Sequence, residues 1–509
     1  MARHALDKDL KRISQIERAT RQLGGFKTAV GIGGLFLIGV LVFTLTLGGH
    51  GGSAWFVVVA GVIGAYMALN IGANDVANNV GPAVGSRALS MTGALVIAAT
   101  CEAAGAIVAG GDVVSTISKG IVDPARVGDA DTFVLAMMAS LLAAAIWVNV
   151  ATWIGAPVST THAVVGGVVG AGMVAAGADA IAWDTMRSIA ASWVISPILG
   201  GLIACAFLAF IKIAILYQPD RLAAARRWIP PLIAVLAACF TVYLVLKGLA
   251  HIWRPPLVLT LGLGAAAGVA AHLTMKPVIA RRSAFLENRR KSVSSLFTMP
   301  LIVSAALLSF AHGANDVANA VGPLAAIVHA AAGDGVAARV TLPWWVLVVG
   351  ALGISFGLVL FGPKLIRTVG EKITKLDQTR AFCVALSAAV TVLVASALGL
   401  PVSSTHIAVG GVFGVGFLRE YWVNLRPRAL PRASTLRSDF HLPPGETSLA
   451  PPMGPVPLRP KRRKRKKRRL VRRRHLQTIV AAWLVTVPLS ALLAAGIFLG
   501  LQAIIPFAS

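Results

Sequence analysis

Two stretches of eleven residues place carboxylate and amide side chains inside otherwise apolar sequence. Residues 72–82 read Gly-Ala-Asn-Asp-Val-Ala-Asn-Asn-Val-Gly-Pro, and residues 313–323 repeat this series with a single change. Oxygen atoms of this kind are the ligands that hard cations such as Na⁺ take in proteins, and an aspartate can instead carry a proton. The glycine and proline residues in each stretch indicate a broken helix. The alternative to cation binding is therefore that the asparagine and aspartate side chains only cap the broken helix. The residues predicted to bind or couple the cation are Asn74, Asp75, Asn78, Asn315, Asp316 and Asn319.

Two further stretches carry three hydroxyl side chains in a row. Residues 157–162 read Pro-Val-Ser-Thr-Thr-His and residues 401–406 read Pro-Val-Ser-Ser-Thr-His, each with a glycine two positions before the proline. A break followed by a first helical turn leaves backbone N–H groups unpaired at the positive end of the helix dipole, which suits an anion. The alternative is helix capping by the hydroxyl groups alone. The residues predicted to bind the substrate are Ser159, Thr160, Thr161, Ser403, Ser404 and Thr405.

Three more titratable residues lie in apolar surroundings. His162 and His406 end the hydroxyl stretches; a histidine can titrate near neutral pH and couple protons, or it can be a hydrogen-bonded structural residue. Glu102 is a lone acid in an apolar segment. An acid inside a membrane is costly and marks a functional site by default, so Glu102 joins the residues predicted to couple the cation; pairing with backbone or a hydroxyl group is the alternative.

Both motifs occur twice and in the same order, 241 and 244 positions apart. The chain is therefore a duplicated unit. Apolar residues make up 56% of it, against roughly 45–50% in soluble globular proteins. Polar groups repeated within such apolar sequence suggest a substrate or ion pathway and so a transporter. The four cysteines show neither metal-site spacing nor a disulfide framework.

The predicted fold class is an all-α polytopic membrane protein of about 12–13 transmembrane spans, with two inverted repeats and broken helices or hairpins at the midplane. The expected spans are residues 29–48, 54–71, 89–110, 133–154, 157–176, 188–216, 230–249, 256–275, 298–312, 342–362, 381–399, 402–418 and 477–506. With the N-terminus in the cytoplasm, the strongly basic loops fall on one face and the acidic loop 111–132 on the other, as the positive-inside rule requires. The span before Gly72 then runs inward and the span before Gly313 runs outward, so the repeats are inverted. We expect a plasma (inner) membrane protein with an extracytoplasmic C-terminus.

One segment outside the repeats carries much of the charge. Residues 419–475 hold 18 Lys or Arg against 3 acids, which is +15 of the net charge of +27. We interpret this segment as a disordered cytoplasmic insert that contacts anionic lipids, and no nucleic-acid partner is expected. The expected division is residues 1–53, cytoplasmic N-terminus and an extra transmembrane helix; 54–217, repeat 1; 218–296, linking spans and loop; 297–418, first part of repeat 2; 419–475, the basic insert; and 476–509, the last span.

At these motifs the chain resembles the inorganic phosphate transporter (PiT) family of cation–phosphate symporters. The resemblance covers residues 55–217 and 297–508, without the basic insert. It implies an inverted-repeat fold that binds phosphate at the membrane centre between the hydroxyl motifs and cotransports Na⁺ or H⁺ through the Asn-Asp motifs. Glu102 matches an acid found in the first repeat of family members. Residues 382–388 lack the second acid that some members carry, which leaves H⁺ or metal-phosphate cotransport open beside Na⁺.

Two alternatives to phosphate import remain. Sulfate is also a tetrahedral oxyanion and has related carriers, but only phosphate carries a proton at neutral pH that Asp75 or Asp316 can accept. A membrane-embedded enzyme is the other alternative, and it lacks both a nucleophile–base constellation and metal-ligand spacing in the sequence. No cofactor is expected, and no metal beyond the coupling cation, Na⁺ or H⁺. A homodimer is a further expectation.

Overall fold

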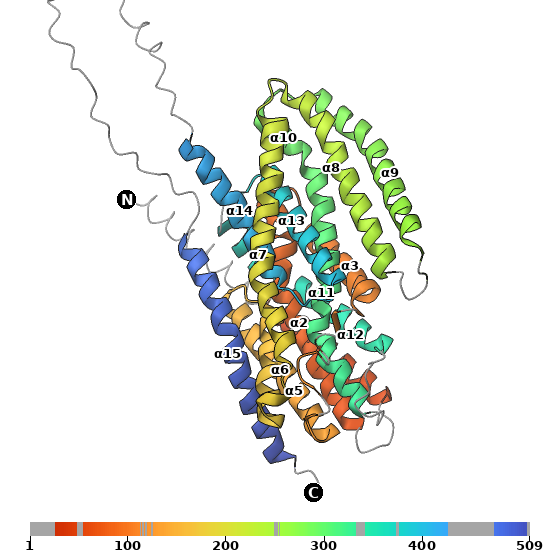
Figure 1. Ribbon diagram of the computed structural model, residues 1–509, viewed down its shortest axis with the longest axis vertical. Helices are drawn as coiled ribbons and strands as arrows, with labels where there is room; N and C mark the ends of the chain where they lie inside the picture. Colours follow the sequence, from red (N-terminus) through yellow and green to blue (C-terminus); the bar gives the residue numbers. More distant parts are fainter. Residues whose placement is uncertain are drawn as a thin grey trace, which may run out of the picture.

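The computed structural model describes residues 26–47, 54–111, 113–114, 117, 120–123, 126–248, 253, 255–331, 342–372, 376–425 and 473–505. Within these ranges the chain is helical apart from turns and an isolated antiparallel bridge between Val122 and Ile181. The predicted all-α class is confirmed (Figure 1). Most of the basic insert, residues 426–472, lies outside the described residues.

The helices follow one another along the whole chain. In chain order they are the N-terminal helix Phe26–Leu47, α2 Ala54–Gly85, α3 Met91–Ala109, α5 Ala130–Ile154, α6 Thr160–Ala176, α7 Trp183–Ile211, α8 Arg221–Tyr243, α9 Leu257–Ala284, α10 Arg290–Leu296, α11 Thr298–Ala331, α12 Trp344–Lys372, α13 Gln378–Ala397, α14 Ser404–Leu425 and α15 Arg473–Ile504. One π-helical turn, Lys212–Leu216, continues α7, and another, Leu244–Gly248, continues α8.

Eleven of the described helices are long and apolar enough to cross a membrane. Each of the thirteen expected segments coincides with a helix, and the two not among the eleven are α6 and α14, which begin at the hydroxyl motifs. The predicted insert is too wide at both ends, because α14 continues to Leu425 and α15 begins at Arg473. Helical hydrogen bonding thus extends past the apolar residues from which the spans were predicted.

Polar side chains fix where several of the apolar helices begin. Asp129 accepts a hydrogen bond from the backbone N–H of Thr132 at 2.7 Å, and Asp377 accepts one from Arg380 at 2.9 Å. These caps occupy donors that have no partner within their own helix. They place the starts of α5 and α13, the two helices that lead into the hydroxyl motifs, at equivalent points of the repeats.

Helices of the two repeats are exchanged rather than packed as separate bodies. The helix α12 lies along α2 and α3 lies along α11, while α15 packs on α6 and α14 packs on α7. Each pair joins one helix from each repeat. Exchanging the two repeats turns the pair α2–α12 into α11–α3, and the pair α6–α15 into α14–α7. In Figure 1, α7 runs upward along the molecule and its counterpart α15 runs downward to the C-terminus. This is the relation expected of inverted repeats.

The Asn-Asp motifs do not break their helices, contrary to expectation. Both α2 and α11 continue through the motif and through Pro82 and Pro323. The glycines serve a close approach instead: a Cβ on Gly72 would lie 1.9 Å from the carbonyl oxygen of Ile354, and one on Gly313 would lie 2.0 Å from that of Glu102. Small residues of this kind let helix backbones touch within a membrane. Of the two motif pairs, it is the hydroxyl motifs that interrupt the helices in the described part of the chain.

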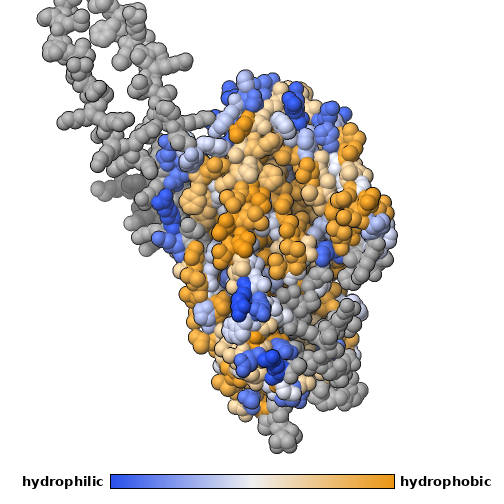
Figure 2. Space-filling view, in the orientation of Figure 1, coloured by the Kyte–Doolittle hydropathy of each residue, from blue (hydrophilic) through white to orange (hydrophobic). Residues whose placement is uncertain are grey.

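The surface agrees with a membrane environment. Figure 2 shows an apolar area over α7, α8 and α9, with hydrophilic residues gathered at the end where α8 and α10 begin. Large apolar side chains there are exposed, among them Leu202, Val235 and Leu261. Contiguous exposed apolar surface on this scale marks contact with lipid or protein. Together with the eleven candidate spans, it identifies an integral membrane protein.

Single cysteines at the equivalent starts of α5 and α13 test the inversion. In a protein whose four native cysteines are replaced, Asp131→Cys should react with an impermeant thiol reagent in intact cells. Gln378→Cys should react only after the membrane is permeabilised, because inverted repeats place the two helix starts on opposite faces. Equal labelling of both positions in intact cells would contradict the inverted arrangement. Equal amounts of each variant in the membrane fraction control for correct insertion.

Candidate functional site

All predicted site residues are buried, and most of them meet where the two repeats touch. Among the described residues at this contact, the backbone departs from helical geometry at the hydroxyl motifs. Gly155 ends α5 with φ +79°, a left-handed conformation that favours glycine, and Gly399 adopts φ +66° at the end of α13. Short extended segments follow, and α6 and α14 begin after them. Ser159 and Ser403 cap these helices by accepting the backbone N–H of the histidine three positions on, at 3.1 and 3.2 Å. Their hydroxyl groups are thus engaged in capping.

The next hydroxyl groups bind the aspartates. Thr160 donates to Asp75 at 2.8 Å within the first repeat, and Ser404 donates to Asp316 at 2.8 Å within the second. Asp75 also accepts from Thr405 at 2.8 Å, so it is held by both repeats. The predicted cation residues and the predicted substrate residues therefore form a single site.

Amide side chains join the repeats in a matching pair of contacts. Asn78 of α2 donates to Thr405 of α14 at 2.8 Å, and Asn319 of α11 donates to Thr161 of α6 at 3.1 Å. The hydroxyl group of Thr161 also donates across the junction to the carbonyl of Val402 at 3.2 Å, and the hydroxyl oxygen of Thr405 lies 3.3 Å from the carbonyl of Val158, each in the extended segment of the opposite repeat. The starts of α6 and α14 consequently abut at the centre of the molecule.

Two further amides hold the extended segments in place. Asn74 donates to Thr152 at 2.9 Å and to the carbonyl of Ala156 at 3.3 Å, and it accepts the N–H of Val158 at 3.2 Å. Asn315 donates to the carbonyl of Val402 at 3.0 Å. Unpaired backbone groups at membrane depth must find such partners. These two asparagines therefore position the hydroxyl motifs in the structure.

A histidine outside the predicted set joins the carboxylates. The Nε2 atom of His312 lies 2.7 Å from Asp316 and 3.9 Å from Asp75, and its Nδ1 atom lies 3.2 Å from Glu102. Asn79 donates to the other oxygen of Glu102 at 2.6 Å. The signal in the sequence was the polar residue directly before Gly313, where the first repeat has isoleucine.

This polar cluster exists in only one of the two equivalent positions. His312, Glu102 and Asn79 stand at the contact of α3 with α11. The equivalent contact of α2 with α12 has Ile71 before the motif glycine, Ile354 opposite that glycine, and Ala320 in place of Asn79. The first two of these are fully buried and Ala320 is nearly so. The repeats thus share their hydroxyl motifs and their aspartates, but Glu102 and His312 have apolar counterparts.

His162 and His406 lie elsewhere in the junction. Their rings meet edge to face at 4.4 Å between centroids, His162 lies against Trp193 at 3.8 Å, and His406 stacks on Trp483 at 3.6 Å. Their contacts are thus with aromatic rings of α7 and α15. A role in proton coupling for either histidine stays a prediction.

The charge of the site decides what it can bind. Asp75, Glu102 and Asp316 are buried carboxylates, and His312 is the one basic side chain that the described residues bring to them. If all three carboxylates were ionised, even a protonated His312 would leave two negative charges uncompensated, which is costly in a membrane interior unless a cation or protons neutralise them. Ligand atoms of Asp75, His312 and Asp316 all lie within 4.8 Å of one another, close enough to share a cation.

Comparison with known proteins identifies this pattern. A model of the phosphate transporter family matches residues 71–494. The chain belongs to the phosphate transporter family. A protein of Helicobacter pylori strain J99, assigned as a phosphate permease, is 46% identical over 97% of this chain and 98% of the relative. A Pyrococcus abyssi protein with the same assignment is 38% identical over 70% of this chain and 88% of its own length.

A solved structure gives the same result for the fold. The structure described as the sodium-dependent phosphate transporter superposes with a TM-score of 0.74 at 34% identity, covering 88% of this chain and all of that one. The fold and family are those of a transporter, so the recognition made from the two motifs is confirmed. In this phosphate transporter family member, both motif pairs lie within the matched region.

The close approach at Gly313 can be tested through stability. Gly313→Ala puts a methyl group against the backbone of Glu102 and should separate α3 from α11, with a cost of about 1–3 kcal/mol. A thermal unfolding midpoint lowered by several degrees in detergent is the expected measurement. The matched control is Gly496→Ala on α15, where an added Cβ meets nothing within 4 Å. Equal midpoints for the two variants would contradict the packing described here.

Proposed function

We propose that this protein imports inorganic phosphate by symport with a cation, Na⁺ or H⁺. The observation that carries the proposal is the contact of two buried carboxylates, Asp75 and Asp316, with two opposed helix starts rich in hydroxyl groups. The first feature attracts cations and the second suits an oxyanion. The phosphate named for the relatives supports this assignment of substrate.

The anion part of the site is formed by the first turns of α6 and α14. Thr160, Thr161, Ser404 and Thr405 belong to these turns, where backbone N–H groups have no acceptor within their own helix and the helix dipoles are positive. Their hydroxyl groups now donate to Asp75, to Asp316 and to backbone carbonyls. A phosphate between the two turns would take over such bonds. Because no lysine or arginine stands in the motifs, the anion is held by dipoles and stays releasable.

The cation part explains why transport would be coupled. A phosphate anion entering beside Asp75 and Asp316 is repelled unless a cation or protons neutralise them. Each ligand then raises the affinity of the other by the same factor, since binding free energies are linked. His312 lies beside both aspartates and Glu102 and can hold a proton among them. Na⁺ is named only for the solved relative, so both cations belong in the test.

Sulfate is the competing substrate. Monohydrogen phosphate can donate its proton to an aspartate oxygen, whereas sulfate has none to donate. The two carboxylates therefore favour phosphate. Competition between unlabelled sulfate and radiolabelled phosphate distinguishes the two: phosphate uptake should be unaffected by sulfate in excess.

Removing the carboxylate charge should uncouple the protein. Asp75→Asn and Asp316→Asn are expected to abolish uptake driven by a Na⁺ or proton gradient into proteoliposomes, because an amide neither neutralises a cation nor releases a proton. Asp184→Asn, an exposed acid paired with Arg187 on α7, is the control and should transport normally. Concentrative uptake by both site variants would show that the aspartates act only as structural acceptors.

Removing the hydroxyl groups should weaken phosphate binding instead. Thr160→Ala and Ser404→Ala are each expected to raise the KM for phosphate about tenfold or more, since a hydrogen bond to a charged ligand contributes about 1.5–3 kcal/mol. The control is Ser140→Ala, which removes a buried hydroxyl of α5 that has no hydrogen-bond partner in the described part of the chain. Unchanged KM values in both site variants would place the anion elsewhere.

A further inference from the structure

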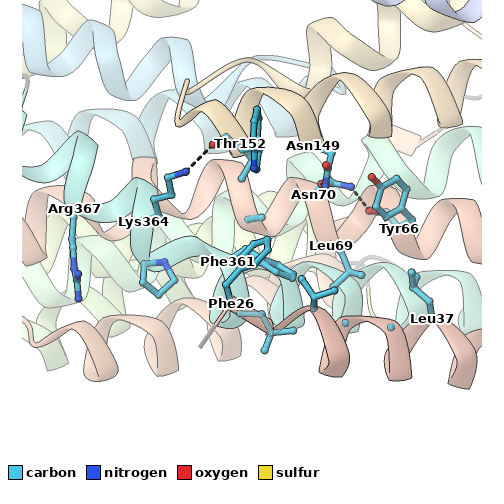
Figure 3. A pocket seen from close by; sticks show the side chains of 17 residues that line it. Phe26, Leu37, Tyr66, Leu69, Asn70, Asn149, Thr152, Phe361, Lys364 and Arg367 are labelled. Carbon is cyan, nitrogen blue, oxygen red and sulfur yellow. Dashed lines mark hydrogen bonds between the residues drawn. The ribbon is translucent and has the colours of Figure 1, made fainter. Parts of the chain in front are cut away.

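A cavity of about 970 Å³ separates the N-terminal helix from α2, α5 and α12. Figure 3 shows it with Phe26 and Leu37 on one wall and Leu69 and Phe361 facing them. Ligand pockets in proteins are usually roughly 300–1,000 Å³ in volume, so this one takes a large ligand. It is separate from the hydroxyl motifs, none of which lines it.

The N-terminal helix is fixed to the core along part of its length. Phe36 lies against Phe356 at 5.1 Å between ring centroids, and Phe43 lies against Trp345 at 6.2 Å. The cavity faces an earlier part of the helix, where Gly33 and Gly34 present no side chain. An added Cβ on Gly34 would meet nothing within 4 Å. The space thus results from two adjacent glycines opposite the aromatic ring of Phe361.

The two ends of the cavity differ in chemistry. Lys364 and Arg367 of α12 lie at one end, as Figure 3 shows, and Lys364 donates to the carbonyl of Trp153 at 2.7 Å. Apolar side chains make up most of the remaining wall. The N-terminal helix itself exposes large apolar residues such as Leu35 and Val42, as a helix in contact with the bilayer does. The cavity therefore lies next to lipid.

We propose that this cavity binds one anionic phospholipid, with its phosphate on Lys364 and Arg367 and an acyl chain along the N-terminal helix. The two cationic side chains at one end of the cavity match the phosphate of the headgroup, and the apolar walls along the rest match an acyl chain. A free phosphate ion would match only the cationic end. The residues following α12 are predicted to face the cytoplasm, and the cytoplasmic leaflet is rich in anionic lipid.

The bound lipid would contact the back of the transport site. Asn70 and Thr152 line the cavity, and Thr152 accepts the hydrogen bond of Asn74, which positions the first hydroxyl motif. Asn149 of α5 donates to Asn70 of α2 at 2.9 Å beside them. A ligand in the cavity would thus contact residues that join α2 to α5, and it would influence transport without contacting the substrate.

Native mass spectrometry of the full-length protein tests the binding. After purification with phosphatidylglycerol and mild delipidation, the parent should retain one tightly bound phosphatidylglycerol, and Gly34→Leu should lose it by filling the cavity. Gly31→Leu is the matched control on the same helix: an added Cβ there also meets nothing within 4 Å, and Gly31 does not line the cavity. Equal retention by the parent and Gly34→Leu would overturn the proposal.

A charge variant and a transport assay separate lipid from free phosphate. Arg367→Gln should lower retention of phosphatidylglycerol roughly fivefold, since one cation near the surface contributes about 1 kcal/mol, and should leave retention of phosphatidylcholine unchanged. Arg289→Gln, an exposed cation at the start of α10, is the control. If Arg367→Gln keeps its lipid but takes up phosphate with a raised KM, equally in neutral and anionic proteoliposomes, the cavity is a path for the ion and the lipid proposal is wrong. This variant also decides the question if Gly34→Leu fails to fold.

Discussion

The energetic constraint on which the rest of the molecule depends is the burial of Asp75, Glu102 and Asp316 in a membrane protein. Uncompensated charge at this depth is expensive, so every neighbouring group is arranged around it. Hydroxyl groups of both motifs donate to the two aspartates, and His312 reaches all three acids. These contacts do not supply enough positive charge to balance three ionised carboxylates, and under the proposed function a cation or protons supply the rest when phosphate binds.

The exchange of helices between the repeats makes this junction responsive to motion. Because α6 packs on α15 and α14 packs on α7, neither hydroxyl motif can move with its own repeat alone. Asn78 and Asn319 carry the same coupling into the site, since each donates to a threonine of the opposite repeat. Under the proposed function, a shift of one repeat would therefore change the hydrogen bonds offered to the anion from both sides, as alternating access requires.

Motif spacing and composition predicted much of this structure, and its failures have physical reasons. Their repetition identified the two motif pairs. The burial of their polar side chains, and the closeness of these side chains to one another, follow from the cost of leaving polar groups in contact with lipid. The helix breaks predicted at Gly72 and Gly313 were wrong, because a glycine that permits a bend also permits a close contact between helices. His312 was missed since periodicity gives the face of a helix but not its neighbour, and only the packing of α3 on α11 brings Glu102 to it.

The two repeats differ in polarity at equivalent helix contacts. The contact of α3 with α11 holds a polar cluster of His312, Glu102 and Asn79, whereas the equivalent contact of α2 with α12 is made by isoleucine and alanine. Sliding at the apolar contact costs little in electrostatic energy, but opening the polar one separates buried charges. In a transporter with inverted repeats, the outward-open and inward-open states have a similar shape. Under the proposed function, the cluster of His312, Glu102 and Asn79 would make the two states unequal in energy, and a cation or proton bound there would shift the balance between them.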